Sequence, residues 1–300
     1  MLSRDDLLAL YECWGLPDQA RAVIDQVRSS SPARRVRSGR GNVSGSYPSR
    51  KMGATIQFES HRVELAAIYE MEHDPGVLEF FDQPPSIKLL YESANRKRMG
   101  VLHTPDFFVI WQDKAGWEEW KQEEDLTRLA EKNPNRYQRD GDGKWRCRPG
   151  EEYSKPLGLY YGVRSSREID WVFQRNIQFL EDYLRCDTPG CAPGVSAALL
   201  GYVHTTPGLS LESLFRLAEG DAGRDDIYNL IGTGAICVDL RAAPLTEPAR
   251  IRIFAPGDQE RRQPGGEPAI CGSPQDLAAS VSCTIAWDGR ERPAKSGTRQ

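Results

Sequence analysis

Two carboxylates and a lysine stand at spacings that suit the hydrolysis of phosphodiester bonds. Asp106 directly follows Pro105 at the start of an apolar run, and Glu119 and Lys121 lie two residues apart in the next run. Side chains at positions i and i+2 share one face of a strand, so Glu119 and Lys121 point the same way and Trp120 points the opposite way. A Pro-Asp pair followed by Glu-x-Lys is typical of metal-dependent phosphodiesterases.

The segment between these two apolar runs predicts a hairpin. Residues 112–116 are polar and end in glycine, which is typical of a turn between paired strands. The hairpin would place Asp106 beside Glu119 on the neighbouring strand. Two carboxylates at that distance repel each other unless a divalent cation lies between them. We therefore expect a metal site here, with Lys121 facing the water or the phosphate.

A third carboxylate comes from a segment with helical spacing. Within residues 59–72, apolar side chains gather on one side, namely Val63, Ala66, Ala67, Ile68 and Tyr69. The Asp-Pro-Gly sequence at 74–76 would end the helix. Such a helix, packed against the sheet, could deliver Glu64 to the metal site.

Length and composition set the outer limits. The 300 residues suffice for one to three domains, and the net charge of -4 argues against general polyanion binding by the whole molecule. No apolar run is long enough to span a membrane, and the N-terminus has no signal-peptide character. The seven cysteines are scattered, which favours reduced thiols in a cytoplasmic protein.

Strand and helix patterns alternate through residues 51–185, which predicts a mixed α/β domain. Apolar runs interrupted at the prolines predict strands within 77–91, and a further strand is expected at 157–163. Helical spacing recurs at 126–131 and 169–185. Residues 133–150 are polar and are expected to form an exposed loop.

Residues 1–50 are expected to form a short helical hairpin followed by a flexible basic arm. Residues 28–51 carry seven lysines and arginines and no acid, and serine and glycine fill most of the rest. Such a stretch cannot bury a core. It is either a solvated linker or an arm whose Arg34, Arg35, Arg37 and Arg40 bind the DNA backbone.

Residues 186–255 show a different order, with three helical segments followed by two strand segments. Three helices and a hairpin are the order of a winged helix. Residues 256–300 are rich in Pro, Gly and Arg, and we expect most of this tail to be disordered.

Several of these motifs together resemble the TnsA family. They are Glu59-Ser60 through Glu64, Asp74-Pro75-Gly76-Val77, Gln83-Pro84, Thr104-Pro105-Asp106-Phe107 and Glu119-Trp120-Lys121. TnsA is the endonuclease subunit of heteromeric transposases and belongs to the restriction-endonuclease-like, PD-(D/E)xK superfamily. The resemblance covers about residues 50–185 and implies that superfamily's mixed sheet flanked by helices. The winged-helix pattern fits the family's C-terminal domain.

The resemblance also implies an activity and its partners. TnsA cuts the 5′ strand at transposon ends in cut-and-paste transposition, while a DDE-type transposase subunit cuts and joins the 3′ side and an ATP-dependent regulator activates the pair. The implied setting is the bacterial cytoplasm, at the nucleoid during transposition.

The family's catalytic residues carry over by motif. Glu64 matches the helix glutamate, Asp106 the aspartate of the Pro-Asp motif, and Lys121 the catalytic lysine. Glu119 stands where some members have glutamine. The implied cofactor is Mg²⁺, with Mn²⁺ as a substitute, bound by Glu64, Asp106 and Glu119.

Two other functions remain open from the sequence. One is a restriction or repair nuclease of the same fold, which would cut without a transposase. The other is a DNA-binding assembly module that keeps the fold and has lost catalysis. A site-specific cut by the protein alone would favour the first of these, whereas cleavage that never appears with Mg²⁺ or Mn²⁺ and all partners would favour the second.

Overall fold

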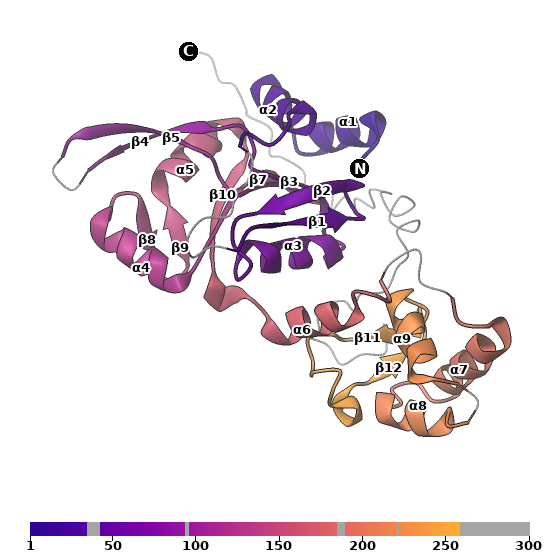
Figure 1. Cartoon of the computed structure of the whole chain (residues 1–300). Coiled ribbons are helices and arrows are strands. Elements are labelled where there is room, and N and C mark those ends of the chain that lie inside the picture. The colour runs from indigo at the N-terminus through magenta and orange to yellow at the C-terminus, as the bar shows by residue number, and fades with distance from the viewer. Residues whose placement is uncertain (35–42, 94–95, 185–189, 221, 259–300) are drawn as a thin grey trace, which may run out of the picture.

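The computed structural model describes residues 1–34, 43–93, 96–184, 190–220 and 222–258 (Figure 1). Three of the four arginines expected to bind DNA, Arg35, Arg37 and Arg40, lie outside these ranges. Almost all of the tail expected to be disordered lies outside them as well.

A four-stranded mixed sheet forms the centre of the larger body. Its strand order is β10-β7-β6-β3, with bounds Tyr160–Ser165, Ala115–Lys121, Phe107–Trp111 and Val77–Asp82. The strand β6 is antiparallel to both of its neighbours, β3 and β7, and β10 runs parallel to β7. This mixed α/β arrangement fits the expected restriction-endonuclease-like fold, and the hairpin between β6 and β7 is confirmed.

The sheet is buried on both faces. Phe107, Val109 and Trp120 face a core that includes α3 (Glu64–His73) and α6 (Trp171–Leu180). Phe108 and Trp117 face a second core on the other side of the sheet. This second core includes α1 (Arg4–Cys13), α2 (Asp18–Ser29) and α4 (Glu123–Lys132). Alternate side chains of a strand point to opposite faces, so an unbroken apolar run indicates a strand covered on both sides.

Three two-stranded sheets surround this centre. The first pairs β1 (Gly45–Ser49) with β2 (Ala54–Phe58), and the second pairs β4 (Ile87–Glu92) with β5 (Arg98–His103). The ribbon of β4 and β5 projects from the body (Figure 1).

The third small sheet corrects the expectation of an exposed loop at 133–150. The strands β8 (Tyr137–Arg139) and β9 (Trp145–Cys147) form a hairpin there, followed by α5 (Arg148–Ser154). Tyr137, Trp145 and Cys147 are buried in the second core because alternate residues of these short strands face inward. The surrounding polar residues masked this alternation in the sequence.

Helix α3 begins later than the sequence pattern predicted, at Glu64 rather than at residue 59. Residues 61–63 form a turn in which the N–H of Leu65 donates to the carbonyl of Ser60 at 3.0 Å. Near the end of the helix, Lys51 Nζ donates to the carbonyls of Met71, Asp74 and Val77 at 2.6, 2.6 and 2.8 Å.

The N-terminal helical hairpin of α1 and α2 is confirmed, but the flexible basic arm is shorter than expected. Arg28 lies in α2 and donates to both carboxylate oxygens of buried Glu79 at 2.8 and 2.9 Å. Residues 45–49 pair with β2, and the Lys51 side chain is largely buried. Some cations of the basic stretch thus have buried polar partners, which composition alone does not reveal.

The C-terminal body has the expected order of three helices and an antiparallel strand pair. The helices are α7 (Pro193–Thr205), α8 (Leu211–Leu217) and α9 (Arg224–Gly232), followed by β11 (Cys237–Val238) and β12 (Ile253–Phe254). Each strand has two residues, so its assignment as a winged helix remains a prediction.

Helix α6 contacts both bodies. Gln174 Nε2 donates to the carbonyl of Ala66 in α3 at 2.9 Å. Asn176 Nδ2 donates to the carbonyls of Leu240 and Ala243, both at 2.8 Å. The proposed boundary near residue 186 therefore lies after a helix that joins the two bodies.

Two smaller expectations can be compared with the structure. Cys237 is disulfide-bonded, which corrects the expectation that every cysteine is reduced, whereas Cys13, Cys147 and Cys191 form no disulfide. In the parts of the chain that the structure describes, no helix has the length and apolar character needed to cross a bilayer.

Candidate active site

The β6–β7 hairpin brings Asp106 and Glu119 together, as the sequence predicted. Its register pairs Phe107 with Glu118, so the next step along the two strands places Asp106 opposite Glu119. The Asp106 side chain is buried, and its Oδ2 accepts a hydrogen bond from the backbone N–H of Trp120 at 2.7 Å. The strand backbone therefore fixes the direction of this carboxylate.

Lys121 ends β7 on the same face. Its Nζ lies 3.8 Å from Asp106 Oδ2, and 23% of its side chain is exposed. Burial opposes its charge, but Asp106, Glu119 and Glu64 together raise the pKa of Lys121. The side chain is therefore an ammonium cation that reaches solvent from a cluster of carboxylates.

Glu64 joins this cluster from the first residue of α3. Its Oε2 accepts a hydrogen bond from the backbone N–H of Glu59 at 2.8 Å, which turns the carboxyl back toward the sheet. Burial and the negative charge of Asp106 raise the pKa of Glu64 to about 8. Burial and the charge of Glu119 likewise raise the pKa of Asp106, against the opposing effect of Lys121.

Glu119 is fully buried, and all its polar contacts fall on one oxygen. Its Oε1 contacts His103 Nε2, accepts from the Tyr137 hydroxyl at 3.2 Å and lies 3.6 Å from an Arg136 guanidinium nitrogen. Burial alone would raise the pKa of Glu119, but Lys121, His103 and Arg136 lower it below its usual range. This carboxylate is therefore ionised.

Sequence reasoning missed these three partners of Glu119. No motif of the sequence points to His103, and Arg136 and Tyr137 lie in a segment expected to be an exposed loop. The only feature of the local sequence that could have indicated these contacts was the position of His103, three residues before Asp106.

The second oxygens of the carboxylates test whether a metal ion fits. Glu119 Oε2 is buried and has no hydrogen-bond partner, and Asp106 Oδ1 and Glu64 Oε1 make no hydrogen bond with the described residues. Native proteins seldom leave a buried oxygen such as Glu119 Oε2 unpaired, and a cation would satisfy it.

The arrangement suits magnesium better than a cation that needs a complete protein cage. Over the described ranges, no three His, Cys, Asp or Glu side chains are grouped closely enough to hold a metal ion by themselves. Mg²⁺ commonly takes one or two carboxylates and keeps waters and substrate phosphate oxygens as its other ligands. With water and substrate phosphate as its other ligands, such an ion would be held by Asp106, Glu119 and Glu64, where Glu119 Oε2 is buried without a hydrogen-bond partner.

A groove of about 550 Å³ opens over the site. Glu64 and Lys121 lie in its wall beside Arg128 and Lys132 of α4. Arg128 pairs with Asp125 and remains mostly exposed. The groove thus presents cations next to buried carboxylates, which suits a phosphodiester strand.

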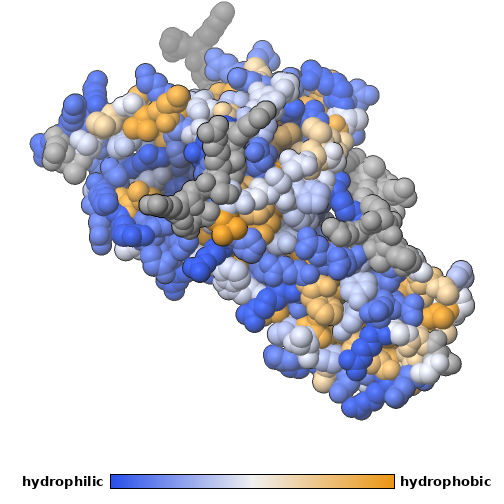
Figure 2. Space-filling view, viewed as in Figure 1, coloured by the Kyte–Doolittle hydropathy of each residue, from blue (hydrophilic) through white to orange (hydrophobic). Residues whose placement is uncertain are grey.

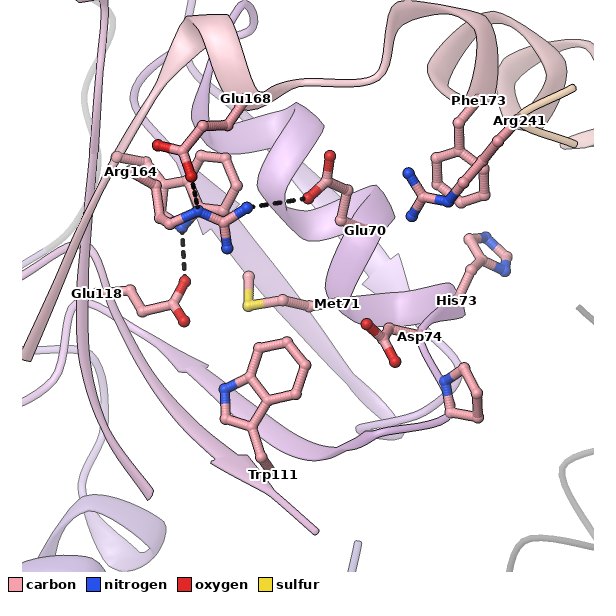
Figure 3. Close-up of a pocket in the computed structure, with 12 residues that line it drawn as sticks. Glu70, Met71, His73, Asp74, Trp111, Glu118, Arg164, Glu168, Phe173 and Arg241 are labelled. Atoms are coloured by element: carbon pink, nitrogen blue, oxygen red, sulfur yellow. Dashed lines mark hydrogen bonds and ion pairs between the residues drawn. The ribbon is translucent and has the colours of Figure 1, made fainter. Parts of the chain in front are cut away.

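The opposite face of β7 carries a separate pocket of about 450 Å³ (Figure 3). There Glu118 accepts from the Tyr160 hydroxyl at 2.8 Å and from Trp120 Nε1 at 2.9 Å. Arg164 lies over the Trp120 ring, 4.6 Å from its centroid, and bonds Glu168 at 2.6 Å. These contacts occupy the side chains on the face of β7 opposite Glu119 and Lys121.

Of the arginines expected to bind DNA, the described residues include Arg34. Its guanidinium donates to Gln83 Oε1 at 2.6 Å and to Glu59 Oε2 at 3.0 Å. The backbone N–H of Glu59 also donates to Glu64. Arg34, at the start of the basic segment, is therefore held beside the site.

Comparison with known families agrees with this geometry. Residues 74–165 match the model of the family described as the N-terminal domain of TnsA-like endonucleases. Residues 74–165 of this chain are thus similar to the N-terminal domain of TnsA-like endonucleases. The TnsA-like region runs from the end of α3 through β10 and contains Asp106, Glu119 and Lys121, whereas Glu64 precedes it. The expected resemblance is therefore confirmed and supports a nuclease that acts in transposition. No curated protein matches the chain.

Proposed function

We propose that this chain is a Mg²⁺-dependent endodeoxyribonuclease that cuts the 5′ strand at transposon ends. It works with a DDE-type transposase subunit, which processes the other strand, and under an ATP-dependent regulator. The observation that carries the proposal is that Asp106, Glu119 and Lys121 lie on one face of a hairpin, and that Lys121 lines a groove together with Glu64.

The carboxylates would hold the metal ion. Asp106 and Glu119 offer oxygens that the protein leaves unpaired, and Glu64 contributes from the helix. When bound, Mg²⁺ or Mn²⁺ would offset the negative charge that develops on the phosphate and lower the pKa of a bound water.

Lys121 has a separate role in this proposal. Asp106, Glu119 and Glu64 raise the pKa of Lys121 and stabilise its protonated form in the metal-free protein. Its ammonium donates a hydrogen bond to the attacking water or to a phosphate oxygen, where it stabilises charge in the transition state. Lys121 is the last residue of β7, and the strand backbone keeps its side chain on the same face as Glu119.

The DNA contacts follow from the surfaces around the site. Arg128 and Lys132 line the groove and would neutralise phosphates on either side of the cleaved bond. The C-terminal body, if it is a winged helix, would add contacts to the transposon end or to the partner subunit.

The test is strand-resolved cleavage of an end-labelled transposon end with the partner transposase and Mg²⁺. Asp106→Asn should lose more than about 100-fold in 5′-strand cutting, because even residues behind a metal ligand contribute 10–100-fold. Asp113→Asn is the matched control, since Asp113 lies exposed in the turn of the same hairpin.

Three outcomes would contradict the proposal. Normal cutting by Asp106→Asn would remove this site from catalysis. Efficient site-specific cutting without a transposase would favour a restriction or repair nuclease. Absence of cutting by the native chain with Mg²⁺ or Mn²⁺ and all partners would favour a non-catalytic assembly module.

A further inference from the structure

The projecting ribbon of β4 and β5 has one covered face and one open face. Ile87 and Leu89 are buried in the second core. Lys88, Leu90 and Leu102 point the other way and are exposed. Among the described strands these two pair only with each other, so the ribbon is not part of a larger sheet (Figure 1).

The open face carries an apolar strip. Leu90 is 60% exposed and Leu102 is 74% exposed, the latter the largest value among the large apolar side chains of the described residues. The register pairs Leu90 with Gly100 and Lys88 with Leu102, so the two leucines are diagonal neighbours on one face.

Gly100 makes this strip continuous. A Cβ built on Gly100 would lie 3.3 Å from Lys88 Cε and 3.4 Å from Leu90 Cδ2, so both side chains lie across the glycine. Figure 2 shows hydrophobic surface over the projecting ribbon, beside strongly hydrophilic surface. Exposed apolar surface of this kind, rimmed by polar groups, commonly marks a binding surface.

The charge of the ribbon indicates which kind of partner it binds. Over residues 87–93 and 96–103 the cations are Lys88, Arg96, Lys97 and Arg98, and the only carboxylate is Glu92, which lies opposite Arg98. The chain as a whole has a net charge of -4, so this is a local basic surface on an acidic protein. DNA presents rows of phosphates, with sugars and base edges between them in the grooves. A ribbon that carries cations with apolar side chains between them is complementary to this surface.

The ribbon is also joined directly to the candidate active site. His103, the last residue of β5, contacts Glu119, and Asp106 follows three residues later. A strand rises about 3.3 Å per residue, so Arg98 lies about 17 Å along the ribbon from His103. One DNA strand rises about 3.4 Å per nucleotide, so the ribbon spans about five base pairs beside the cut.

We propose that the β4–β5 ribbon binds the DNA duplex flanking the cleaved bond. Lys88, Arg96 and Lys97 contact phosphates, and Leu90 and Leu102 lie against sugars and base edges in a groove. In other DNA-binding proteins, two-stranded ribbons lie in a DNA groove, and apolar side chains insert between base steps in the minor groove. The proposal rests on the proposed nuclease function and adds the surface that sets the path of the substrate.

The first experiment measures DNA affinity with the full-length Asp106→Asn chain and a transposon-end duplex, so that cutting does not interfere. The triple variant Lys88→Gln, Arg96→Gln, Lys97→Gln should flatten the dependence of log K on log salt by up to about 2.7, since each phosphate contact contributes about 0.9. The control removes three exposed cations elsewhere, Lys144, Arg148 and Lys155. An unchanged slope in the ribbon variant, or an equal change in the control, would overturn the proposal.

The second experiment separates the apolar contact from charge. Leu90→Ser with Leu102→Ser should weaken binding about tenfold, equivalent to about 1.4 kcal/mol, and leave the salt slope unchanged. Leu90 pairs with Gly100, three residues from His103, so a photocrosslinking residue at position 90 should label DNA about three base pairs from the cut, and the same residue at position 144 should not. Unaltered affinity without a crosslink, together with lost binding of the transposase, would make the ribbon a protein-docking surface instead.

The two proposals fail in different ways. If the Asp106→Asn chain binds the duplex and loses affinity in the ribbon variants, the ribbon assignment stands even where the native chain does not cut. If the native chain cuts the 5′ strand and its ribbon variants bind and cut normally, only the ribbon assignment fails.

Discussion

Arg136 lies 3.6 Å from Glu119 Oε1, and the two side chains are only 13% and 0% exposed. Arg136 stands just before β8, outside the hairpin that carries the candidate catalytic residues. A segment expected to be a surface loop therefore holds one of the buried carboxylates in place. We therefore expect that substitutions in this segment change the free energy of unfolding through their effect on Glu119.

Arg136→Met should destabilise the metal-free protein by about 3 kcal/mol, the lower end of the cost of breaking a buried ion pair, because Glu119 keeps other partners. Glu119→Gln in the same chain should recover part of the loss, since it removes the unpaired charge. Urea unfolding in EDTA measures both effects. Arg128→Met is the control, because its ion pair with Asp125 is exposed and is worth less than about 1 kcal/mol. Additive effects of Arg136→Met and Glu119→Gln would show that the pair is not coupled.

His103→Gln should reduce cleavage by about 10–100-fold, the usual effect of altering a group that orients a metal ligand. The reason is that His103 contacts the one oxygen of Glu119 that the protein holds, so its loss frees the carboxylate to rotate. The Mg²⁺ concentration for half-maximal cutting should rise. His61→Gln is the control, because its ring lies against Phe58 rather than a carboxylate. A loss of stability with an unchanged Mg²⁺ requirement would make His103 merely structural.

Glu64 should make the metal-free protein less stable as pH rises. Its folded-state pKa of about 8 lies above the ordinary value of 4.5, so the folded state holds a proton that the unfolded state has already released. This contribution is largest below about pH 4.5 and is lost progressively as pH rises to about 8. Glu64→Gln should remove this decline.

The measurement for Glu64 is urea unfolding in EDTA at several pH values between 5 and 9. The difference in unfolding free energy between Glu64→Gln and the native chain should grow toward high pH. Glu151→Gln, at a more exposed carboxylate paired with Arg146, should show no such growth. A constant difference across the range would mean that Glu64 carries no raised pKa.

The basic arm should add sequence-independent affinity for DNA. Replacing Arg34, Arg35, Arg37 and Arg40 with alanine should flatten the slope of log K against log salt by up to about 3–4, if each contacts one phosphate. Arg34 alone should contribute least, because it already bonds Gln83 and Glu59. An unchanged slope for the fourfold variant would identify the segment as a linker.

Local sequence rules were sufficient for the β6–β7 hairpin and its catalytic face. The two-residue period of a strand fixed Glu119 and Lys121 on one side, and the polar turn at 112–114 joined strands close enough to bring Asp106 opposite Glu119. These relations depend on neighbours within about fifteen residues and on backbone geometry alone. The order of helices and strands after residue 190 was recognisable for the same reason.

The tertiary structure decided how the carboxylates are held. The start of α3 at Glu64 depends on a turn that begins at Ser60, and the contacts of Glu119 come from His103, Arg136 and Tyr137 on separate elements. The same holds for Arg28, which appeared to belong to a free arm and instead pairs with Glu79. Burial and pairing of charges depend on which distant segments pack together, and one-dimensional patterns of residue type carry little of that information.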